Sequence, residues 1–356
     1  MHVPDGFINA PVSAVAGVVA AGAVAVSLRG ARRELGGASR AEGHGGERAA
    51  PLAGLVAAFV FAVQMLNFPV AAGTSGHLLG GALAAILVGP WTGVLCIAVV
   101  LLMQGVLFAD GGLTALGVNI DVMGVVTVVT AYALFRGLVL VLPRTRRSVT
   151  LASFVAALVS VPAAAAAFAL VYAVGGTTDV PVGKVLTAMV GVHVLIGIGE
   201  AVITMLTVGA VLAVRPDLVY GARGLTAPLK LRVDGELVGA APAAPAAPVS
   251  TGSPKRLWVG GVVTALVLAG FVSFYASASP DGLEKVAADQ GIDARADEYE
   301  HATADSPLAD YGVRGIAAER LSGGLAGVIG VGATLAVGTG VFLVVRRRRA
   351  AAAESV

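Results

Sequence analysis

The amino-acid sequence predicts an all-α integral membrane protein, in which a bundle of seven helices is followed by a two-helix hairpin. Of the 356 residues, 57% are hydrophobic and 13% are charged, whereas an ordinary soluble domain carries about 45–50% apolar and about 25% charged residues. The mean hydropathy is +0.87. The charged residues gather in clusters between long uncharged runs, as expected for loops that connect membrane-spanning helices.

Each long uncharged run is interpreted as a membrane span, because a helix needs about 20 apolar residues to cross a bilayer. The third run is short for a full crossing and follows a Gly/Ser-rich turn, so we expect it to be tilted or partly re-entrant. The candidate spans are residues 7–28, 51–67, 77–88, 90–109, 118–142, 150–174, 185–214, 257–276 and 325–345.

The distribution of basic residues predicts the orientation of these spans. If the N-terminus lies outside and the spans alternate, the C-terminus lies in the cytoplasm. Most of the 24 Lys and Arg residues, including those at 346–349, then face the cytoplasm, as the positive-inside rule expects. No basic segment or small-residue cleavage site precedes the first span, so we expect Met1 to be retained at the outer face of the plasma membrane. The basic residues assigned to the outside are Lys184, Lys285, Arg295, Arg314 and Arg320.

We expect two domains joined by a tether. The Ala/Pro-rich segment 240–248 is typical of an extended low-complexity linker. The predicted division is a membrane domain at 1–224, a cytoplasmic linker at 225–256 and a two-helix domain at 257–356. The external loop of the second domain, 277–320, has ten acidic and four basic residues. This acidity either gathers cations or is that of an ordinary solvated loop.

Residues 1–7, here called the N-terminal segment, contain a candidate chelate for a transition metal. A histidine in second place offers three nitrogen donors: the free amine of Met1, the deprotonated backbone amide of His2 and an imidazole nitrogen of His2. These donors lie in one plane and leave one in-plane position open, an arrangement that suits Ni(II) or Cu(II) and that Co(II) accepts. Pro4 and Gly6 turn the chain before the first span. A histidine after the initiator methionine is weak evidence when taken alone.

A donor for the open position is expected in the Gly/Ser-rich turn at 73–77. On the predicted orientation His77 lies at the same face of the membrane as Met1, so it is the expected fourth donor. Ser75 lies in the same turn, and polar backbone at membrane depth is tolerated only where it is buried in protein or lines a cavity. A lone histidine at a helix start is more often a cap or an interfacial residue, but the depth shared with His2 favours a ligand.

Four further polar residues are expected near this region. Asp110 and Asn119 lie in the outer loop after the fourth span, whereas His193 and Glu200 share one face of the seventh span. Polar groups within a span are costly to bury and are functional candidates by default. Glu200 lies roughly 10 Å deeper than His193, so we expect it to support the site rather than to bind metal. His193 either orients His77 or competes with it as the fourth ligand.

Other chemistries fit the sequence less well. Cys96 is the only cysteine, so the chain lacks the cysteines for a disulfide or a cysteine-based metal site. The net charge of +2 does not favour a nucleic-acid partner. The turn also matches the G-x-S-G pattern of intramembrane serine proteases, with Ser75 as nucleophile and His193 as base. That pattern is short and leaves the N-terminal segment unexplained, so we do not expect an enzyme. Two histidines in loops are expected to have no specific role: His44 and His301.

Several motifs lie in the loops and at the ends of the spans. They are MHVPDGF at 1–7, GTSGHLLGG at 73–81, DGGL at 110–113, HVLIGIGEA at 193–201, PDGLE at 280–284 and SPLADY at 306–311. The first four resemble the signature segments of the CbiM/NikM family, the substrate-binding membrane subunits of energy-coupling-factor transporters for cobalt or nickel. The last two resemble the PDGLE domain, the two-helix CbiN/NikN-type accessory component. The chain therefore looks like a natural fusion of both components.

The resemblance implies a ligand set, a substrate and partners. It implies that the metal is held by the Met1 amine, the His2 amide and imidazole, and His77, and that the loop at 277–320 acts on metal loading. The transported substrate would be Co2+ or Ni2+, and the sequence leaves the choice between them open. No G-x-x-x-x-G-K-[ST] phosphate loop occurs in the chain, so no ATP site is expected. The implied partners are a CbiQ-like membrane coupling subunit and CbiO-like ATPase subunits.

Overall fold

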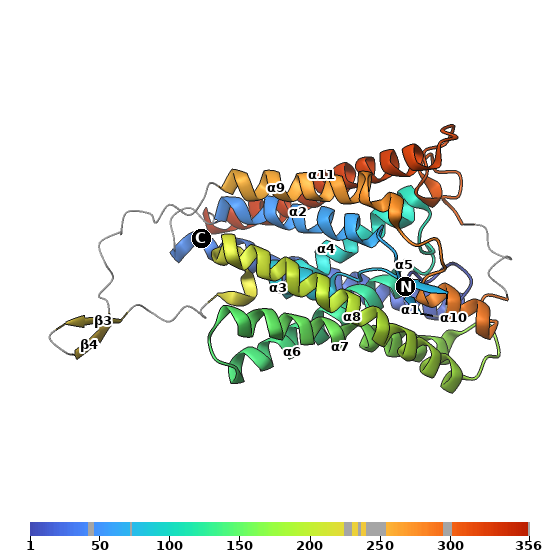
Figure 1. The fold of residues 1–356 in the computed structure, drawn as a ribbon, viewed down its shortest axis with the longest axis horizontal. Helices are drawn as coiled ribbons and strands as arrows, with labels where there is room; N and C mark the ends of the chain where they lie inside the picture. Colours follow the sequence, from blue (N-terminus) through green and yellow to red (C-terminus); the bar gives the residue numbers. More distant parts are fainter. Residues whose placement is uncertain are drawn as a thin grey trace.

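The computed structural model describes residues 1–41, 46–71, 73–223, 230–233, 236–239, 254–294 and 301–354. The long helices run side by side as an elongated bundle (Figure 1). Met1 and α10 (Gly282–Gln290) lie toward one end of the bundle, here called the Met1 end, and α11 (Glu319–Glu354) ends at the opposite end (Figure 1).

The helices of the first part form in the uncharged runs of the sequence. Their starts carry recognisable local signals: Pro90 occupies the first turn of α4, and the Thr145 side chain caps α7 by accepting a hydrogen bond from Ser148 N. In chain order the helices are α1 (Ala10–Ala41), α2 (Gly46–Gln64), α3 (Gly81–Val88), α4 (Pro90–Met103), α5 (Leu116–Asn119), α6 (Thr127–Val141), α7 (Arg146–Gly175) and α8 (Val182–Val214).

Seven helical stretches in the described part of the chain are long and apolar enough to cross a membrane, in agreement with the predicted multi-pass membrane class. The predicted third span is different, because Gly80 adopts a left-handed conformation with φ 86° and the helix begins only at Gly81. All eight residues of α3 are buried. At roughly 12 Å long, α3 does not cross a bilayer. The apolar part of α2, Ala49–Gln64, is also shorter than the seven stretches. The seven are Ala10–Leu35, Pro90–Phe108, Leu116–Val141, Arg146–Gly175, Val182–Val214, Arg256–Tyr275 and Glu319–Arg346.

Two helices of the second part of the chain, which follows the predicted linker, pack closely against α2 (Figure 1); they are α9 (Pro254–Gly270) and α11. A Cβ atom added at Gly54 of α2 would lie 2.2 Å from the Thr339 hydroxyl of α11. A Cβ atom added at Gly330 of α11 would lie 2.2 Å from the Phe61 ring of α2. Glycines therefore let these backbones approach, as is common between helices in membranes.

Short elements connect the helices where the sequence predicted only loops or a linker. Strands β1 (Phe68–Ala71) and β2 (Thr74–Gly76) pair antiparallel between α2 and α3, with Pro69 opposite Ser75. Strands β3 (Lys230–Val233) and β4 (Glu236–Gly239) form a hairpin within the predicted linker. The tether predicted at 240–248 lies outside the described residues. The 3-10 turns are η3 (Pro216–Leu218), η4 (Tyr220–Ala222), η5 (Val272–Tyr275) and η7 (Ala309–Tyr311).

Candidate metal centre

The N-terminal segment is fastened to the loop that follows α4. The Asn119 side chain accepts a hydrogen bond from Val3 N at 2.8 Å and donates one to Val3 O at 3.1 Å. Gly112 N donates to the same carbonyl at 2.9 Å. Asp5 accepts hydrogen bonds from the backbone N–H and the hydroxyl of Thr114, at 2.8 and 2.5 Å. These bonds hold the free amine inside the protein, where the first residue is only 2% exposed.

Two π-helical turns flank this loop. η1 (Gln104–Phe108) continues α4 and begins with Gln104, and η2 (Ile120–Val126) begins directly after Asn119. Both amide side chains are buried and both contact the N-terminal segment, because Gln104 Oε1 lies 3.1 Å from His2 Nε2. π-Helical turns are rare and frequently occur at functional sites. Asn119 is among the residues that the sequence predicts for this region, whereas Gln104 is not; its only sequence signal is a polar amide inside an otherwise apolar run.

His77 lies directly after β2 and faces the N-terminal amine. Its Nε2 atom is 2.6 Å from Met1 N, and its Nδ1 atom is 3.0 Å from the Leu78 carbonyl oxygen. Since Nδ1 lies beside an acceptor, the proton of the neutral ring belongs there, and Nε2 directs its lone pair at the amine. Two nitrogens bound to one metal at right angles, each at about 2.0 Å, lie about 2.8 Å apart. The Met1 and His77 nitrogens therefore have the spacing of adjacent ligands.

The His2 ring stacks on the His77 ring, with centroids 5.0 Å apart and planes inclined by 14°. Its Nδ1 atom is 3.2 Å from Asp110 Oδ1. Burial lowers the pKa of His2 to about 4, so the ring is neutral at pH 7, which is the form that binds metals. Among the described residues no group bonds the His2 backbone N–H, the remaining nitrogen of the predicted chelate.

Asp281, at the start of α10, reaches the same place from the second part of the chain. Its Oδ2 atom is 2.5 Å from Met1 N and 3.4 Å from His77 Nε2. Burial alone would raise the pKa of Asp281, but the N-terminal ammonium beside it holds that pKa well below its usual range. The sequence reasoning quoted Asp281 only as part of a motif. Its D-x-x-E spacing predicts a capping box with Glu284, which is present, but gives no sign of its partner 280 residues away.

Ser75 does not lie beside a catalytic base. Its backbone N–H donates to Pro280 O at 2.9 Å, and its hydroxyl donates to Ser279 O at 2.7 Å. The Nδ1 atom of His193 instead lies 2.7 Å from Met189 O, and within the described part of the chain His193 Nε2 has no partner. The serine–histidine pair that the protease alternative requires is therefore not formed, and Ser75 holds the turn that precedes α10.

Glu200 supports the turn that carries His77. Its carboxylate accepts hydrogen bonds from Leu79 N at 2.6 Å and Gly80 N at 3.1 Å. It is fully buried, and it contacts the backbone just after His77 rather than the candidate donors themselves. This supporting position agrees with the greater depth expected for Glu200 in α8.

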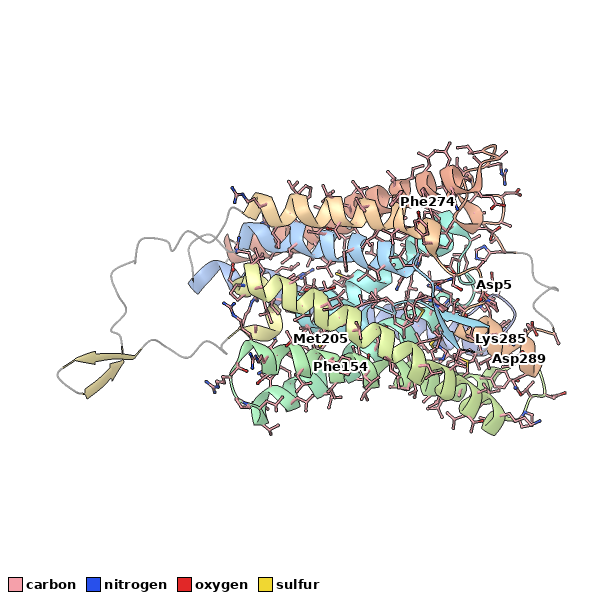
Figure 2. The ribbon with its side chains drawn as sticks, in the orientation of Figure 1. Asp5, Phe154, Met205, Phe274, Lys285 and Asp289 are labelled. Atoms are coloured by element: carbon pink, nitrogen blue, oxygen red, sulfur yellow. The ribbon has the colours of Figure 1, made fainter. Side chains whose placement is uncertain are left out.

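A cleft of about 810 Å³ opens over the candidate donors. His301 lines it and donates from Nε2 to Gly111 O at 3.1 Å, so it contacts the loop after α4. The Tyr311 hydroxyl, also on the second part, donates to Asp110 Oδ2 at 2.5 Å. His44 lies outside the described residues. Figure 2 shows Asp5 and the cleft residue Phe274 at the Met1 end of the bundle, whereas Phe154 and Met205 lie along its middle.

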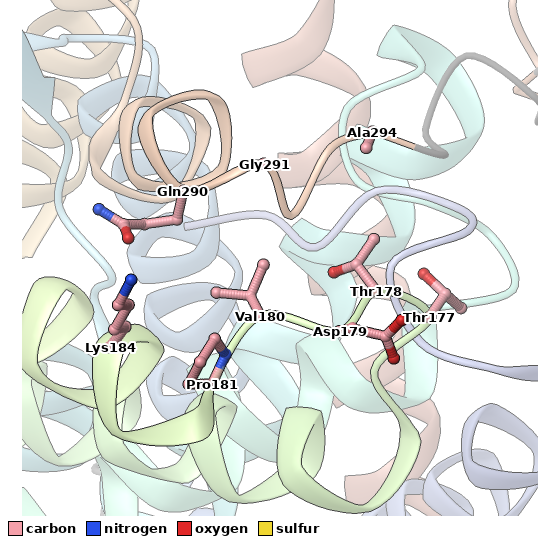
Figure 3. Close-up of a pocket in the computed structure, with 9 residues that line it drawn as sticks. All are labelled: Thr177, Thr178, Asp179, Val180, Pro181, Lys184, Gln290, Gly291 and Ala294. Carbon is pink, nitrogen blue, oxygen red and sulfur yellow. The ribbon is translucent and has the colours of Figure 1, made fainter.

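A second pocket, of about 640 Å³, lies between the α7–α8 loop and the end of α10 (Figure 3). Lys184 and Gln290 point toward each other on one side of it, and Thr178 and Asp179 lie on the other (Figure 3). None of the predicted donors lines this pocket. In the described part of the chain, no group of three or more His, Cys, Asp or Glu side chains is arranged to hold a metal.

Comparison with known proteins gives matches over both parts of the chain. Residues 2–218 match the family described as "Cobalt uptake substrate-specific transmembrane region", and residues 255–347 match the PDGLE domain. A protein of Haloquadratum walsbyi named as a metal transport protein is 38% identical over 220 residues, which cover 62% of this chain and 94% of that protein.

Two further matches extend this comparison. The fused nickel transport protein NikMN of Archaeoglobus fulgidus is 37% identical over 221 residues, covering 62% of this chain and 68% of that protein. The crystal structure of a truncated transition metal transporter superposes with a TM-score of 0.50 at 28% identity, covering 60% of this chain and 99% of that one.

Proposed function

The chain belongs to the CbiM family of cobalt and nickel transport components and carries a PDGLE domain after its CbiM region, and from this premise we propose that it is the substrate-specific subunit of an energy-coupling-factor importer. This subunit binds divalent cobalt or nickel and delivers it across the plasma membrane. The proposed division is the metal-binding domain at 1–224, the linker at 225–256 and the PDGLE-type domain at 257–356.

The observation that carries the proposal is the distance of 2.6 Å between Met1 N and His77 Nε2 at a buried position. The Met1 amine, the His2 amide and imidazole and the His77 imidazole form the proposed donor set. Neutral nitrogen donors and a deprotonated amide suit Ni(II) and also accept Co(II). Gln104, Asn119 and Glu200 fix the segments that carry these donors, through His2, Val3 and the backbone after His77.

Energy for transport comes from partner subunits in this proposal, since the chain has no phosphate-binding loop. The partners are a CbiQ-like coupling subunit in the membrane and CbiO-like ATPase subunits. The metal enters from the outside, because the proposed orientation puts the Met1 end and its cleft on the outer face. The basic residues at 346–349 then lie in the cytoplasm, which the positive-inside rule favours.

The metal-binding proposal is tested with two forms of the full chain that differ only at the N-terminus. One carries a C-terminal tag and begins with Met1, and the other retains one glycine before Met1 after cleavage of an N-terminal tag. The native form is expected to bind one Ni2+ or Co2+ per chain, and the extended form to lose tight binding because its amine is displaced. Equal, stoichiometric metal in both forms would remove the amine from the site.

The proposed orientation is tested with Ala302→Cys and Ala351→Cys, each in a Cys96→Ser background. An impermeant maleimide applied to intact cells is expected to label the first variant and not the second. Labelling of the second variant alone would reverse the orientation and move the cleft to the cytoplasmic side.

A further inference from the structure

We propose that Asp281 is the counter-ion of the metal site, so that the site is complete only while the turn at 279–284, here called the Pro280 turn, is docked against the first part of the chain. The inference rests on the proposed function, because it concerns regulation of the same site. It assigns the second part of the chain a direct electrostatic role in holding the metal.

The first step is geometric. Asp281 Oδ2, Met1 N and His77 Nε2 form a triangle with sides of 2.5, 2.6 and 3.4 Å. A metal about 2.0 Å from the Met1 nitrogen lies no more than about 4.5 Å from Oδ2. The carboxylate is therefore fixed next to the metal position, whichever face of the donor plane it occupies.

The second step is the balance of charge in a buried site. A divalent metal bound to one deprotonated amide and neutral nitrogens leaves the chelate with a charge of about +1. A buried charge without a counter-charge is costly. In the structure the N-terminal ammonium is the cation that Asp281 neutralises. When the metal binds, the protons of the amine and amide leave to solvent and the chelate takes the place of the ammonium.

Asp110, the acid beside the His2 ring, is committed elsewhere. Asp110 approaches His2 Nδ1 with one oxygen at 3.2 Å, but its second oxygen accepts the Tyr311 hydroxyl. The Asp110 side chain is 26% exposed, whereas the Asp281 side chain is 11% exposed. Asp281 is therefore the less exposed of the two carboxylates, and it is the one in contact with the amine.

The third step is the fit of the Pro280 turn. Ser75 donates to the turn's Ser279 and Pro280 carbonyls from its hydroxyl and its backbone N–H, and Ser277 N donates to Asn67 O at 2.7 Å. A Cβ atom added at Gly282 would lie 2.7 Å from Ile196 Cδ1 and 3.1 Å from His193 Cε1, both on α8. The turn therefore packs so closely on α8 that a side chain at position 282 would not fit. A larger residue there would move Asp281 away from the amine.

The test measures Ni2+ affinity of the purified full-length chain by calorimetry. Asp281→Asn and Asp281→Ser both retain an N-cap for α10 but lose the negative charge, and each is expected to weaken binding about 10–100-fold. Asp281→Glu keeps the charge and is expected to bind more tightly than either. A merely structural role would give the opposite order, because Asn is the closest match in shape. If the Asn variant does not fold, the Ser variant carries the same comparison.

Two more variants separate docking from charge. Gly282→Val keeps Asp281 but blocks the close fit on α8, and it is expected to weaken Ni2+ binding to the same extent. Asp289→Asn, the matched control, makes the same charge change on an exposed residue of the same helix and is expected to leave affinity unchanged.

The outcomes distinguish this inference from the proposed function. Wild-type affinity in Asp281→Asn and Asp281→Ser, together with loss of binding in the glycine-extended chain, would overturn the counter-ion and leave the function intact. A native chain that binds neither Ni2+ nor Co2+ would overturn both.

Discussion

Two irregular segments meet at the candidate metal centre, and they are held there in different ways. The N-terminal segment is fastened by Asn119, Gly112 and Thr114, all of the first part of the chain. The Pro280 turn is fastened mainly by Ser75 and by the ion pair between Asp281 and the amine. The first segment carries the proposed nitrogen donors, and the second carries the Asp281 carboxylate.

This difference indicates that the N-terminal segment is the more firmly held of the two. The donors are positioned by several bonds along the N-terminal segment, so the loss of one bond leaves the others in place. The carboxylate depends on the contacts of Ser75, the backbone bond from Ser277 to Asn67, a close glycine fit and an electrostatic contact. We therefore expect the donor side of the site to set whether metal binds and the Pro280 turn to set how tightly.

The largest expected effect comes from removing a donor. His77→Ala should lower Ni2+ affinity by more than about 100-fold, beyond the range of about 10–100-fold seen for residues that only support a ligand. Calorimetry on the purified full chain measures this directly. An effect no larger than that of Asp281→Asn would erase the distinction between the two segments.

Acid is expected to weaken the donor side and not the Pro280 turn. Burial lowers the pKa of His2 from 6.5 to about 4, so between these values the unfolded chain binds more protons than the folded one. Stability rises with pH in such a window, and it is therefore lost as the pH falls from about 6.5 to 4, by up to about 3 kcal/mol. The lowered pKa of Asp281 keeps that carboxylate charged throughout.

The measurement is the thermal midpoint of the metal-free chain between pH 7 and 4.5, in detergent. The midpoint is expected to fall with pH in the wild type and to fall less in His2→Gln. Parallel profiles for the two proteins would show that His2 does not contribute the pH dependence.

A smaller loss of Ni2+ affinity is expected when the N-terminal segment is loosened but every proposed donor is kept. Asn119→Ala leaves the buried Val3 N–H unpaired, at a cost of about 1–3 kcal/mol, while Gly112 still bonds Val3 O. Ni2+ affinity should fall about tenfold. Asn119→Asp retains the acceptor for Val3 N and should recover part of the loss; no recovery would argue against this contact as the cause.

Ser75→Ala is expected to weaken the docking of the Pro280 turn modestly. It removes the hydroxyl contacts with Ser279 O and Pro280 O and keeps the backbone bond to Pro280 O, so it costs about 1 kcal/mol. We expect tryptic cleavage after Lys285 of α10 to become roughly fivefold faster. Unchanged cleavage would mean that the hydroxyl does not help to dock the turn.

The smallest change in Ni2+ affinity is expected for His193→Leu. The ring packs under Gly282, its Nε2 atom has no partner among the described residues, and His77 occupies the position beside the amine. Replacing it by an apolar residue of similar size should change Ni2+ affinity less than about threefold. A loss as large as that of His77→Ala would make His193 the fourth ligand.

Sequence alone determined the membrane class and most of the spans, because hydropathy is a local property summed along about 20 residues. It also predicted the candidate donors at Met1 and His2, because a chelate formed by consecutive backbone and side-chain nitrogens needs no tertiary information, and it predicted His77 from the depth that the orientation of the spans implies. The distribution of basic residues predicts an orientation in the same way, from local counts.

Only the tertiary structure decided which distant segments meet these donors. The length of the third apolar run already set it apart from a full span, but only the structure shows that the left-handed Gly80 starts α3 and that all of α3 is buried. Asp281 reaches Met1 from 280 residues away because Ser75 and the glycine fit on α8 bring the Pro280 turn there. Such contacts depend on shape and hydrogen bonds between loops, which leave no periodic pattern in the sequence.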